Sequence, residues 1–451
     1  MRFRPSRAGW VDSLPEPWGE ARARFVAAVN PTKSEISHLD EGTEVTFVPM
    51  EAVSENGTID ISRNKMLAEV TAGYTYFVDG DILVAKITPC FENGKAALAV
   101  GLTNGIGFGS TEFHVLRAHR GLDRRFLLHL VRSAPFREFG AASMYGAGGQ
   151  KRVPTEFIMD FVIPLPPPAE QRAIADFLDR ETAKIDALIA AQERLISLLD
   201  EKRQATITHA VTKGLDPNAP MKESGVEWMG TIPAQWPAVM LRFLLNYIEQ
   251  GWSPEAEDRR AEPGEWAVLK SGCVNGGIFR QDEHKALPSD LLPIEELEVR
   301  PGDVIMSRAS GSRALIGSVS YVEKCSAKLM LSDKLFRLRP RLNMISPRYL
   351  AIVLGAQPCR AQIEQSISGA EGLANNLTQA TIKRLLICLP SLVEQEIIMH
   401  HLDRVTAELD QLQFHGMKII ERLRERRTAL ITAAVTGQID VTRQAITETA
   451  K

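Results

Sequence analysis

Two glycine-containing loops carry side chains of the kinds that contact DNA. Residues 149–152 combine a flexible backbone with a glutamine, a lysine and an arginine, and residues 308–313 contain two arginines and two serines. Arginine pairs with guanine, glutamine or asparagine with adenine, and serine or lysine with phosphates. With further residues of these types, the candidate DNA contacts are Lys86, Lys95, Gln150, Lys151, Arg152, Arg308, Ser310, Ser312, Arg313, Lys334, Asn375 and Asn376. A solvated surface position is the simpler interpretation of any single one, so the hypothesis depends on the joint pattern.

The candidates fall in two basic stretches of the chain. Between residues 86 and 152, and again between 297 and 342, Lys and Arg outnumber Asp and Glu. The formal net charge of the whole chain is only -3, so acidic residues elsewhere balance these stretches. Local basic stretches on an otherwise balanced protein predict two phosphate-contacting faces, one in each half of the chain.

Motifs of enzymes that act on DNA are missing from the sequence. Residues 30–33 lack the second proline and the aromatic residue of an adenine methyltransferase loop, and the glycines of 105–109 open no helix. No GxxxxGK[ST] loop for ATP occurs. The acid-x-Lys triplet at Glu283 and the paired histidines His400 and His401 are too common as patterns to indicate a nuclease or a metal site. We therefore expect a non-catalytic chain that binds no metal and no cofactor of its own.

Length and composition indicate a soluble protein of several domains. A chain of 451 residues is too long for one core, and 44% hydrophobic with 24% charged residues is ordinary for a globular protein. The five cysteines are scattered without a CxxC pair, which fits a reducing compartment. Neither a signal peptide nor an apolar run long enough to span a bilayer is visible. The expected location is the cytoplasm, without a membrane partner.

One stretch of the chain occurs twice, and this repeat indicates which elements position the candidate loops. The copies begin near Pro166 and Pro390 and align without a gap at an offset of 224 residues. Identical pairs include Glu170 with Glu394, Gln171 with Gln395, Asp186 with Asp410, and Arg203 with Arg427. The segments before these copies echo each other only weakly. After a duplication, the part that stays similar in both halves serves a shared function, and the part that diverges serves two different functions. The simplest case is two different recognition domains on one scaffold.

Both copies are predicted to be long helices. Prolines precede each start and none follows the first turn, and apolar residues recur in steps of three, four or seven. The predicted coiled-coil seam is Ile174, Leu178, Ile185, Leu188, Leu195 and Leu199 in the first helix and Ile398, Leu402, Leu409, Leu412, Ile419 and Leu423 in the second. Gln192 and its counterpart Gly416 interrupt the apolar rows. The first copy would extend roughly 64 Å at about 1.5 Å per residue.

The chain is therefore expected to be α+β, with a pseudo-twofold internal repeat. Strand-like segments at 80–87 and 113–116 are echoed at 302–308 and 335–338, and a Pro-, Asn- and Gly-containing connection follows Gly214. The expected segments are a globular domain at 1–165, a long helix at 166–213, a linker at 214–236, a second globular domain at 237–389, a second long helix at 390–437 and a tail at 438–451. The two helices would pack as an antiparallel coiled coil.

At these residues the sequence resembles the specificity subunits of type I restriction-modification systems. The resemblance rests on the Pro-Glu-Gln helix start of 164–178, the linker from Asp216 to Trp236, and segments 80–95 and 303–308, and it spans essentially the whole chain. One departure is Leu392-Val393, where the family usually has a further proline.

The resemblance implies two target recognition domains, each reading one half of a bipartite site in double-stranded DNA, with the helices as a ruler for the spacer. It also implies partners that carry the chemistry. Two modification subunits would bring S-adenosylmethionine for DNA methylation, and restriction subunits would bring ATP- and Mg-dependent translocation and cleavage. The competing interpretation is a non-catalytic scaffold that joins two protein-binding units without touching DNA.

Overall fold

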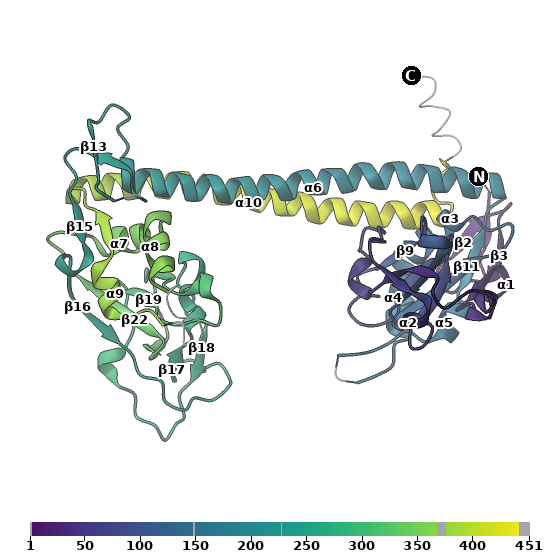
Figure 1. Ribbon diagram of the computed structural model, residues 1–451, viewed down its shortest axis with the longest axis horizontal. Coiled ribbons are helices and arrows are strands. Elements are labelled where there is room, and N and C mark those ends of the chain that lie inside the picture. Colours follow the sequence, from purple (N-terminus) through teal and green to yellow (C-terminus); the bar gives the residue numbers. More distant parts are fainter. Residues whose placement is uncertain (1, 148, 227, 368–375, 442–451) are drawn as a thin grey trace. The chain divides into compact units, whose positions relative to one another are not determined.

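The chain forms two compact units, each built from one globular segment and parts of both long helices. The computed structural model describes residues 2–147, 149–226, 228–367 and 376–441. Unit 1 comprises Met1–Arg194 with Gly416–Lys451, and unit 2 comprises Leu195–His415. Each unit therefore contains the first half of one long helix and the second half of the other (Figure 1). Among the described residues, no helix is long and apolar enough to cross a membrane.

The globular part of unit 1 contains two four-stranded sheets. One has the order β4 (Ala27–Val29), β11 (Phe113–Ala118), β8 (Ile82–Ala85), β9 (Ala96–Leu98), and the other has the order β6 (Asn64–Met66), β5 (Glu44–Val48), β10 (Ile106–Gly109), β7 (Thr75–Val78). β8 is buried along its whole length, as expected for an uninterrupted apolar run in a central strand. Helices α3 (Arg124–Val131), α4 (Ala134–Ala142) and α5 (Thr155–Asp160) complete this part. Its short elements are β1 (Phe3–Pro5), β2 (Ser13–Pro15), β3 (Gly19–Arg22), β12 (Val162–Leu165), α1 (Ala23–Val26), α2 (Leu67–Val70), η1 (Lys33–Ile36), η2 (Met50–Ala52) and η3 (Thr103–Gly105).

Unit 2 repeats this topology. Its larger sheet has the order β16 (Leu245–Gln250), β22 (Leu335–Pro340), β19 (Val304–Ser307), β20 (Val319–Tyr321), and its second sheet has the order β18 (His284–Ala286), β17 (Trp266–Leu269), β21 (Lys328–Met330). In both units the second sheet contains one parallel pair, β5 with β10 and β17 with β21. Helices α7 (Pro347–Gly355), α8 (Gln357–Ile367) and α9 (Gln379–Arg384) follow the larger sheet. The remaining elements are β13 (Met221–Glu223), β14 (Thr231–Pro233), β15 (Ala238–Met240), β23 (Leu386–Cys388), η4 (Leu241–Phe243), η5 (Ser271–Gly277), η6 (Glu295–Leu297) and η7 (Arg313–Leu315).

The long helices are α6 (Pro168–Lys213) and α10 (Leu392–Val435). They begin differently. Prolines open α6, whereas α10 begins with a capping box in which the Ser391 N–H and hydroxyl donate to Glu394 Oε2 at 2.9 and 2.7 Å, and the Glu394 N–H donates to Ser391 Oγ at 3.3 Å. The missing proline at Leu392-Val393 is thus replaced by another start signal.

The same glutamine fastens each long helix to its globular part. In unit 1, Gln171 Oε1 accepts from the Asp123 N–H at 2.7 Å, and its amide donates to the Gly121 and Pro166 carbonyls. In unit 2, Gln395 Oε1 accepts from the Ser346 N–H at 2.8 Å, and its amide donates to two carbonyls in the same way. Both glutamine side chains are buried, so the retained glutamine is a structural attachment point.

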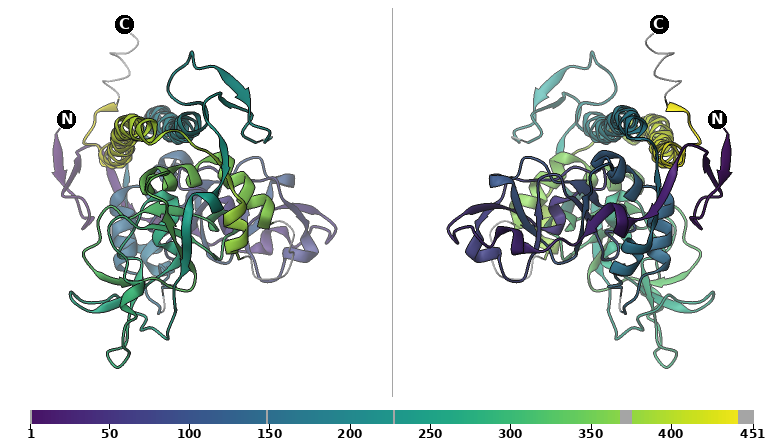
Figure 2. Two further views of the ribbon diagram at one scale, coloured as in Figure 1. Left: turned by 90° about the vertical axis from the view of Figure 1, so that its left-hand side faces the viewer. Right: turned by 90° about the vertical axis from the view of Figure 1, so that its right-hand side faces the viewer.

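The helices lie side by side and antiparallel within each unit, and Figure 2 shows the pair end-on. Their contact stripe corrects part of the predicted seam, because Leu188, Leu195, Leu412 and Ile419 are exposed. The fully or partly buried stripe of α6 is Leu178, Thr182, Ile185, Ile189, Gln192, Ile196, Leu199, Arg203, Thr206 and Ala210, and that of α10 is Leu402, Thr406, Leu409, Gln413, Gly416, Ile420, Leu423, Arg427, Leu430 and Ala434. The steps alternate strictly between three and four, and the two stripes are 224 residues apart throughout.

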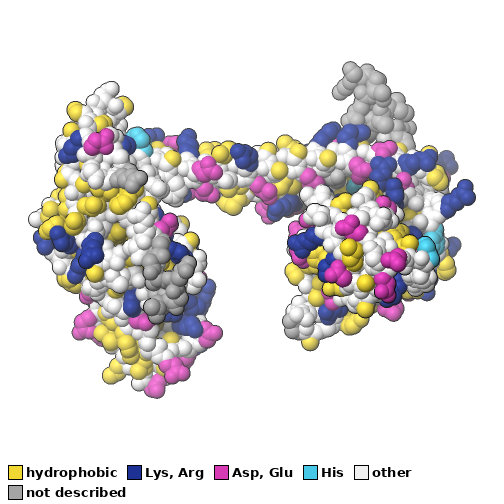
Figure 3. Space-filling view, in the orientation of Figure 1, with side chains coloured by type: hydrophobic (Ala, Val, Ile, Leu, Met, Phe, Trp, Pro, Cys, Tyr) yellow, Lys and Arg dark blue, Asp and Glu magenta, His cyan; other side chains and the backbone are white. Residues whose placement is uncertain are grey.

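The predicted seam followed the wrong leucines in the middle of each helix. Apolar side chains occur there at two neighbouring helical positions, for example Leu188 beside Ile189, and periodicity alone does not say which one faces the partner. The structure places polar Gln192 and small Gly416 in the contact stripe and leaves an apolar row outside it. Hydrophobic side chains are accordingly visible along the surface of the long helices in Figure 3.

Two reciprocal ion pairs set the register of the helices. In unit 1, Arg427 binds Asp186 through Nε at 2.8 Å and Nη2 at 3.2 Å. In unit 2, Arg203 binds Asp410. The sequence repeat matches the two aspartates with each other and the two arginines with each other. The fold then pairs each arginine with the aspartate of the other copy.

Candidate DNA interface

The two globular parts build their candidate loops on one shared backbone framework. In unit 1, the residue after β8, Lys86, donates its N–H to the Glu112 carbonyl at 2.9 Å and accepts from the Val153 N–H at 2.9 Å. In unit 2, the residue after β19, Arg308, donates to the Lys334 carbonyl at 2.8 Å and accepts from the Leu377 N–H at 2.9 Å. Three chain segments therefore meet in the same way in each unit, although the side chains at the equivalent positions differ.

In unit 1 the framework collects the predicted residues of three segments. Lys95 lies beside this point, because its carbonyl accepts from the Ala85 N–H at 3.0 Å. The loop with Gln150 and Lys151 is docked by Thr88, whose hydroxyl donates to the Gly149 carbonyl at 2.8 Å and accepts from the Lys151 N–H at 3.0 Å. The side chains of Gln150 and Lys151 are exposed. The structure thus leaves both available at the edge of the loop.

Arg152 is engaged within the protein. Its Nε and Nη2 lie 2.9 Å from Glu112 Oε2 and Oε1 respectively. The hydrogen bonds from Arg152 lower the pKa of Glu112, so this carboxylate stays ionised. The ion pair therefore stabilises the loop. The sequence did not show this ion pair, because Glu112 lies 40 residues away along the chain; a DNA contact by Arg152 stays a prediction.

In unit 2 the structure brings together Arg308, Ser310, Lys334 and Asn376. Arg308 donates Nη1 to the Asp333 carbonyl at 3.4 Å and lies over the Phe336 ring, and Ala309 forms a bridge with Asn376. Lys334 is exposed at the adjoining turn. Ser312 and Arg313 lie at the exposed far end of the same loop, and Asn375 lies outside the described residues.

Several other arginines of the basic stretches stabilise the fold. Arg117 forms two 2.7 Å hydrogen bonds to the buried Asp81, and Arg339 makes the equivalent contact of 2.7 Å with the buried Asp303. Arg337, which is 1% exposed, also binds Asp303, at 3.2 Å. The positive charge available to a ligand is therefore smaller than the residue counts implied.

An exposed aromatic residue accompanies each loop set, and the sequence reasoning missed both. Tyr145 is 65% exposed and exchanges backbone hydrogen bonds with Arg152. Trp252 is 37% exposed and donates its N–H to the Leu331 carbonyl, close to the Lys334 turn. Exposed aromatic rings beside basic residues can contact bases or sugars. The sequence signal was an aromatic residue next to a glycine, which occurs too widely to single out.

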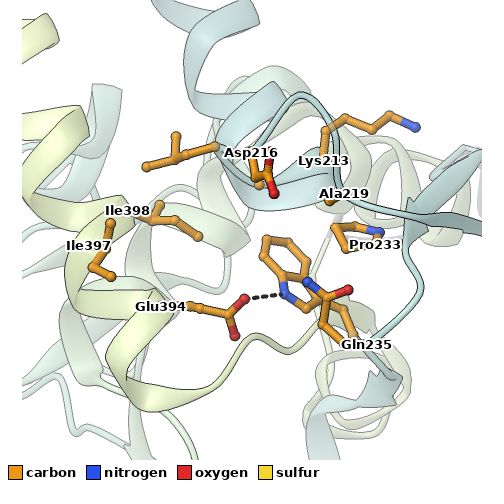
Figure 4. A pocket seen from close by; sticks show the side chains of 11 residues that line it. Lys213, Asp216, Ala219, Pro233, Gln235, Glu394, Ile397 and Ile398 are labelled. Carbon is orange, nitrogen blue, oxygen red and sulfur yellow. Dashed lines mark hydrogen bonds between the residues drawn. The ribbon is translucent and has the colours of Figure 1, made fainter.

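Unit 2 also has a hollow of about 180 Å³ where α6 ends and α10 begins. Its walls include Lys213, Asp216, Ile397 and the Trp236 indole, which donates to Glu394 Oε1 at 3.1 Å (Figure 4). Trp236 is buried and belongs to the hydrophobic core of unit 2. Burial acts to raise the pKa of Glu394, but hydrogen bonds from Ser391 and Trp236 outweigh it and lower the pKa. The hollow is thus tied to the helix junction and not to the recognition loops.

Comparisons with known proteins agree with this organisation. Residues 31–196 and 242–415 match the family described as the type I restriction modification DNA specificity domain, once in each half. The chain belongs to this family. It is 30% identical to the EcoEI specificity subunit of Escherichia coli, over 89% of this chain and 79% of the relative. Specificity subunits are non-catalytic, so the family membership favours DNA recognition over the protein-binding scaffold and over a self-contained enzyme.

Solved structures show the same fold. A chain from a study of complex assembly and conformational transition in a type I restriction-modification system has a TM-score of 0.71, with 20% identity, 94% coverage of this chain and 99% of that chain. The HsdS subunit of Thermoanaerobacter tengcongensis has a TM-score of 0.50 at 20% identity, covering 94% of this chain and 98% of that chain.

Proposed function

We propose that this type I specificity subunit reads a bipartite DNA sequence through the two loop sets described above. The globular segments at 1–165 and 237–389 would be the target recognition domains, and each would contact one half-site in the major groove. The observation that carries this proposal is the repeated backbone framework with different side chains at equivalent positions. Such a framework presents two different patterns of donors and acceptors from one scaffold, which is what an asymmetric site requires.

The residues with exposed or partly exposed side chains carry the proposed contacts. In unit 1 these are Lys86, Lys95, Gln150 and Lys151, with Tyr145 beside them, and in unit 2 they are Arg308, Ser310, Ser312, Arg313, Lys334 and Asn376, with Trp252 beside them. Lysines and serines would position the protein on phosphates, and Gln150, Arg308 and Arg313 would read base edges. Asn375 is part of the same proposal from its sequence position alone.

The long helices would hold the two recognition domains apart and dock the partners. Their retained repeat, their whole-length contact stripe and the reciprocal ion pairs support a rigid spacer. The apolar row outside the stripe supports docking, because a row of exposed apolar side chains is typical of a surface that binds another protein. Since the row recurs at the 224-residue offset, with Leu188 matching Leu412 and Leu195 matching Ile419, we infer two equivalent docking surfaces for two modification subunits.

The chemistry would then reside in partner subunits. Modification subunits would supply S-adenosylmethionine and methylate adenine, and restriction subunits would supply ATP- and Mg-dependent translocation and cleavage. Such a complex would act on DNA inside the cell, so we propose a cytoplasmic location.

The test is methylome sequencing of the host with and without this chain. We expect N6-methyladenine to disappear from one bipartite motif, which would also reveal both half-sites and the spacer. An unchanged methylome in a host that expresses the whole complex would contradict the proposal.

A second experiment separates base contacts from phosphate contacts. Arg308→Ala and Arg313→Ala are each assayed for binding to variants of the site. A phosphate contact should weaken all sequences alike, whereas a base contact should relax one position of the second half-site and cost about 1–3 kcal/mol there. Loss at a position of the first half-site would contradict the assignment of these residues to one domain.

A further inference from the structure

Three arginines of unit 1 gather where the long helices meet the globular part. Arg132 ends α3, Arg137 lies in α4, and Arg427 lies in the contact stripe of α10. Arg132 Nη2 donates to the Glu55 carbonyl at 2.9 Å, and Arg427 Nη2 donates to the Asn56 carbonyl at 3.4 Å. The loop at 54–58 therefore covers the cluster with two successive backbone carbonyls.

The loop fits closely over Arg132. Gly57 has a φ of +92°, and a Cβ at this position would lie 2.4 Å from Arg132 Nη1. The positive φ favours glycine at this position, and its backbone lies close against the Arg132 guanidinium. The contact between loop and arginine is therefore specific, although it supplies dipoles and no negative charge.

Negative charge in the cluster is insufficient. Asp186 pairs with Arg427, and within the described residues neither Arg132 nor Arg137 forms an ion pair. The carboxylate of Glu55 points to the Asn93 amide, at 2.8 Å. Arg132 is only 7% exposed, and a buried charge without a direct ion-pair partner is costly. Burial and the nearby Arg427 and Arg137 lower the pKa of Arg132 to about 9, because they outweigh the opposing effect of the Asp186 and Asp179 carboxylates.

Unpaired donors adjoin the same cluster. Arg137 Nε and Ser133 Oγ are buried without a hydrogen-bond partner in the described part of the chain. Ser133 follows Arg132 directly and stands at the N-terminus of α4, where its side chain caps no backbone N–H. Buried polar groups are normally hydrogen-bonded, so such a pair of orphans beside three arginines is unusual.

Two other arginines, the buried Arg337 and the partly buried Arg360, show how this protein provides acceptors for a guanidinium group. Arg337 has Glu249 and Asp303 as carboxylate partners and the Glu296 and Glu298 carbonyls as further acceptors. Arg360 donates to two carbonyls at 2.6 and 2.8 Å. Arg132 has neither arrangement. The cluster is thus a feature of unit 1 alone among these sites.

We propose that Arg132, Arg137 and Arg427 form a phosphate-binding site, with the Glu55 and Asn56 carbonyls occupying two positions that phosphate oxygens would take. Guanidinium groups bind phosphate through paired N–H donors. Because Asp186 already offsets the charge of Arg427, a bound phosphate would offset the charge of Arg132 and Arg137. The phosphate can come from the backbone of bound DNA, in which case the inference rests on the proposed function, or from free phosphate in the cell.

The first test uses thermal unfolding of the full-length chain in inorganic phosphate and in chloride at equal ionic strength. We expect phosphate at ten times its Kd to raise the melting temperature of the wild-type protein by roughly 2–4 °C, and to raise that of Arg132→Gln much less. Arg426→Gln is the matched control, because it removes an exposed arginine from α10 next to Arg427, and it should keep the wild-type shift. Excluded-solute effects of phosphate act on all three proteins alike.

In chloride, Arg132→Gln should be at least as stable as the wild type, because it removes an uncompensated buried charge. Should this variant fold poorly, Arg137→Gln gives the same comparison at a less buried position. The proposal is overturned if wild type and variants respond equally to phosphate.

A second arm identifies the source of the phosphate. If it belongs to DNA, the slope of log binding constant against log salt concentration should be smaller by about one in Arg132→Gln than in the wild-type complex. An unchanged slope together with a phosphate-dependent melting shift assigns free phosphate. If the wild-type complex binds no specific DNA yet shows the Arg132-dependent phosphate shift, the proposed function fails and this inference stands.

Discussion

Removal of one heptad from both long helices tests the ruler most directly. The deletion takes out residues 191–197 from α6 and residues 416–422 from α10. Both reciprocal ion pairs, Asp186 with Arg427 and Asp410 with Arg203, flank these segments and have the same antiparallel register. Since seven residues are two turns of a contact stripe that repeats every seven, the shortened helices should pack as before.

The expected effect follows from the helix rise. Seven residues at about 1.5 Å each shorten the spacer by roughly 10.5 Å, which is about 3 base pairs at ~3.4 Å per base pair. Three base pairs also turn the duplex by about 100° when a full turn takes 10–10.5 base pairs, whereas a heptad turns the helix pair by only about 20°. We therefore expect an optimum spacer up to about 3 base pairs shorter, with weaker binding than in the wild type.

The assay is binding or methylation by the complex on DNA that contains both half-sites and every spacer length over one helical turn. A control deletion of one heptad from α6 alone breaks the register between the two ion pairs and should abolish specific binding. An unchanged spacer optimum at wild-type affinity, or altered half-site sequences, would refute the ruler.

The remaining predictions concern stability and partner binding. Burial lowers the pKa of His129 below the value of about 6.5 that the unfolded state has, so the unfolded state takes up a proton first as the pH falls. The folded protein should therefore lose stability below about pH 6.5. His129→Gln should reduce the fall in unfolding free energy between pH 7 and 5.5, whereas the control His38→Gln, at an exposed position, should leave it unchanged. Asp303→Asn should cost about 3–5 kcal/mol in urea unfolding, because two arginines lose their buried carboxylate, and a loss below about 1 kcal/mol would contradict this. Leu188→Glu should change the unfolding free energy by less than about 0.5 kcal/mol but weaken binding of the modification subunit. Ile189→Glu should destabilise the chain by about 1–3 kcal/mol. A larger loss of stability for Leu188→Glu than for Ile189→Glu would support the seam predicted from the sequence.

Local signals in the sequence determined the long helices and the repeat. Proline before each start, glycine after Lys213 and after Thr436, and apolar steps of three and four act within a few residues, so they can be read without knowing the fold. The capping box at Ser391 was equally local and could have been found from its spacing to Glu394. The family resemblance likewise rested on contiguous motifs.

Tertiary structure decided which neighbouring side chain faces a partner. Leu188 and Ile189 are both apolar and adjacent, and only the position of the second helix makes one exposed and the other partly buried. The ion pair of Arg152 with Glu112 joins two segments that are distant in the sequence. The arginine cluster joins α3, α4 and α10, which are far apart in sequence. Such pairings depend on long-range contacts, and local periodicity and composition carry no information about them.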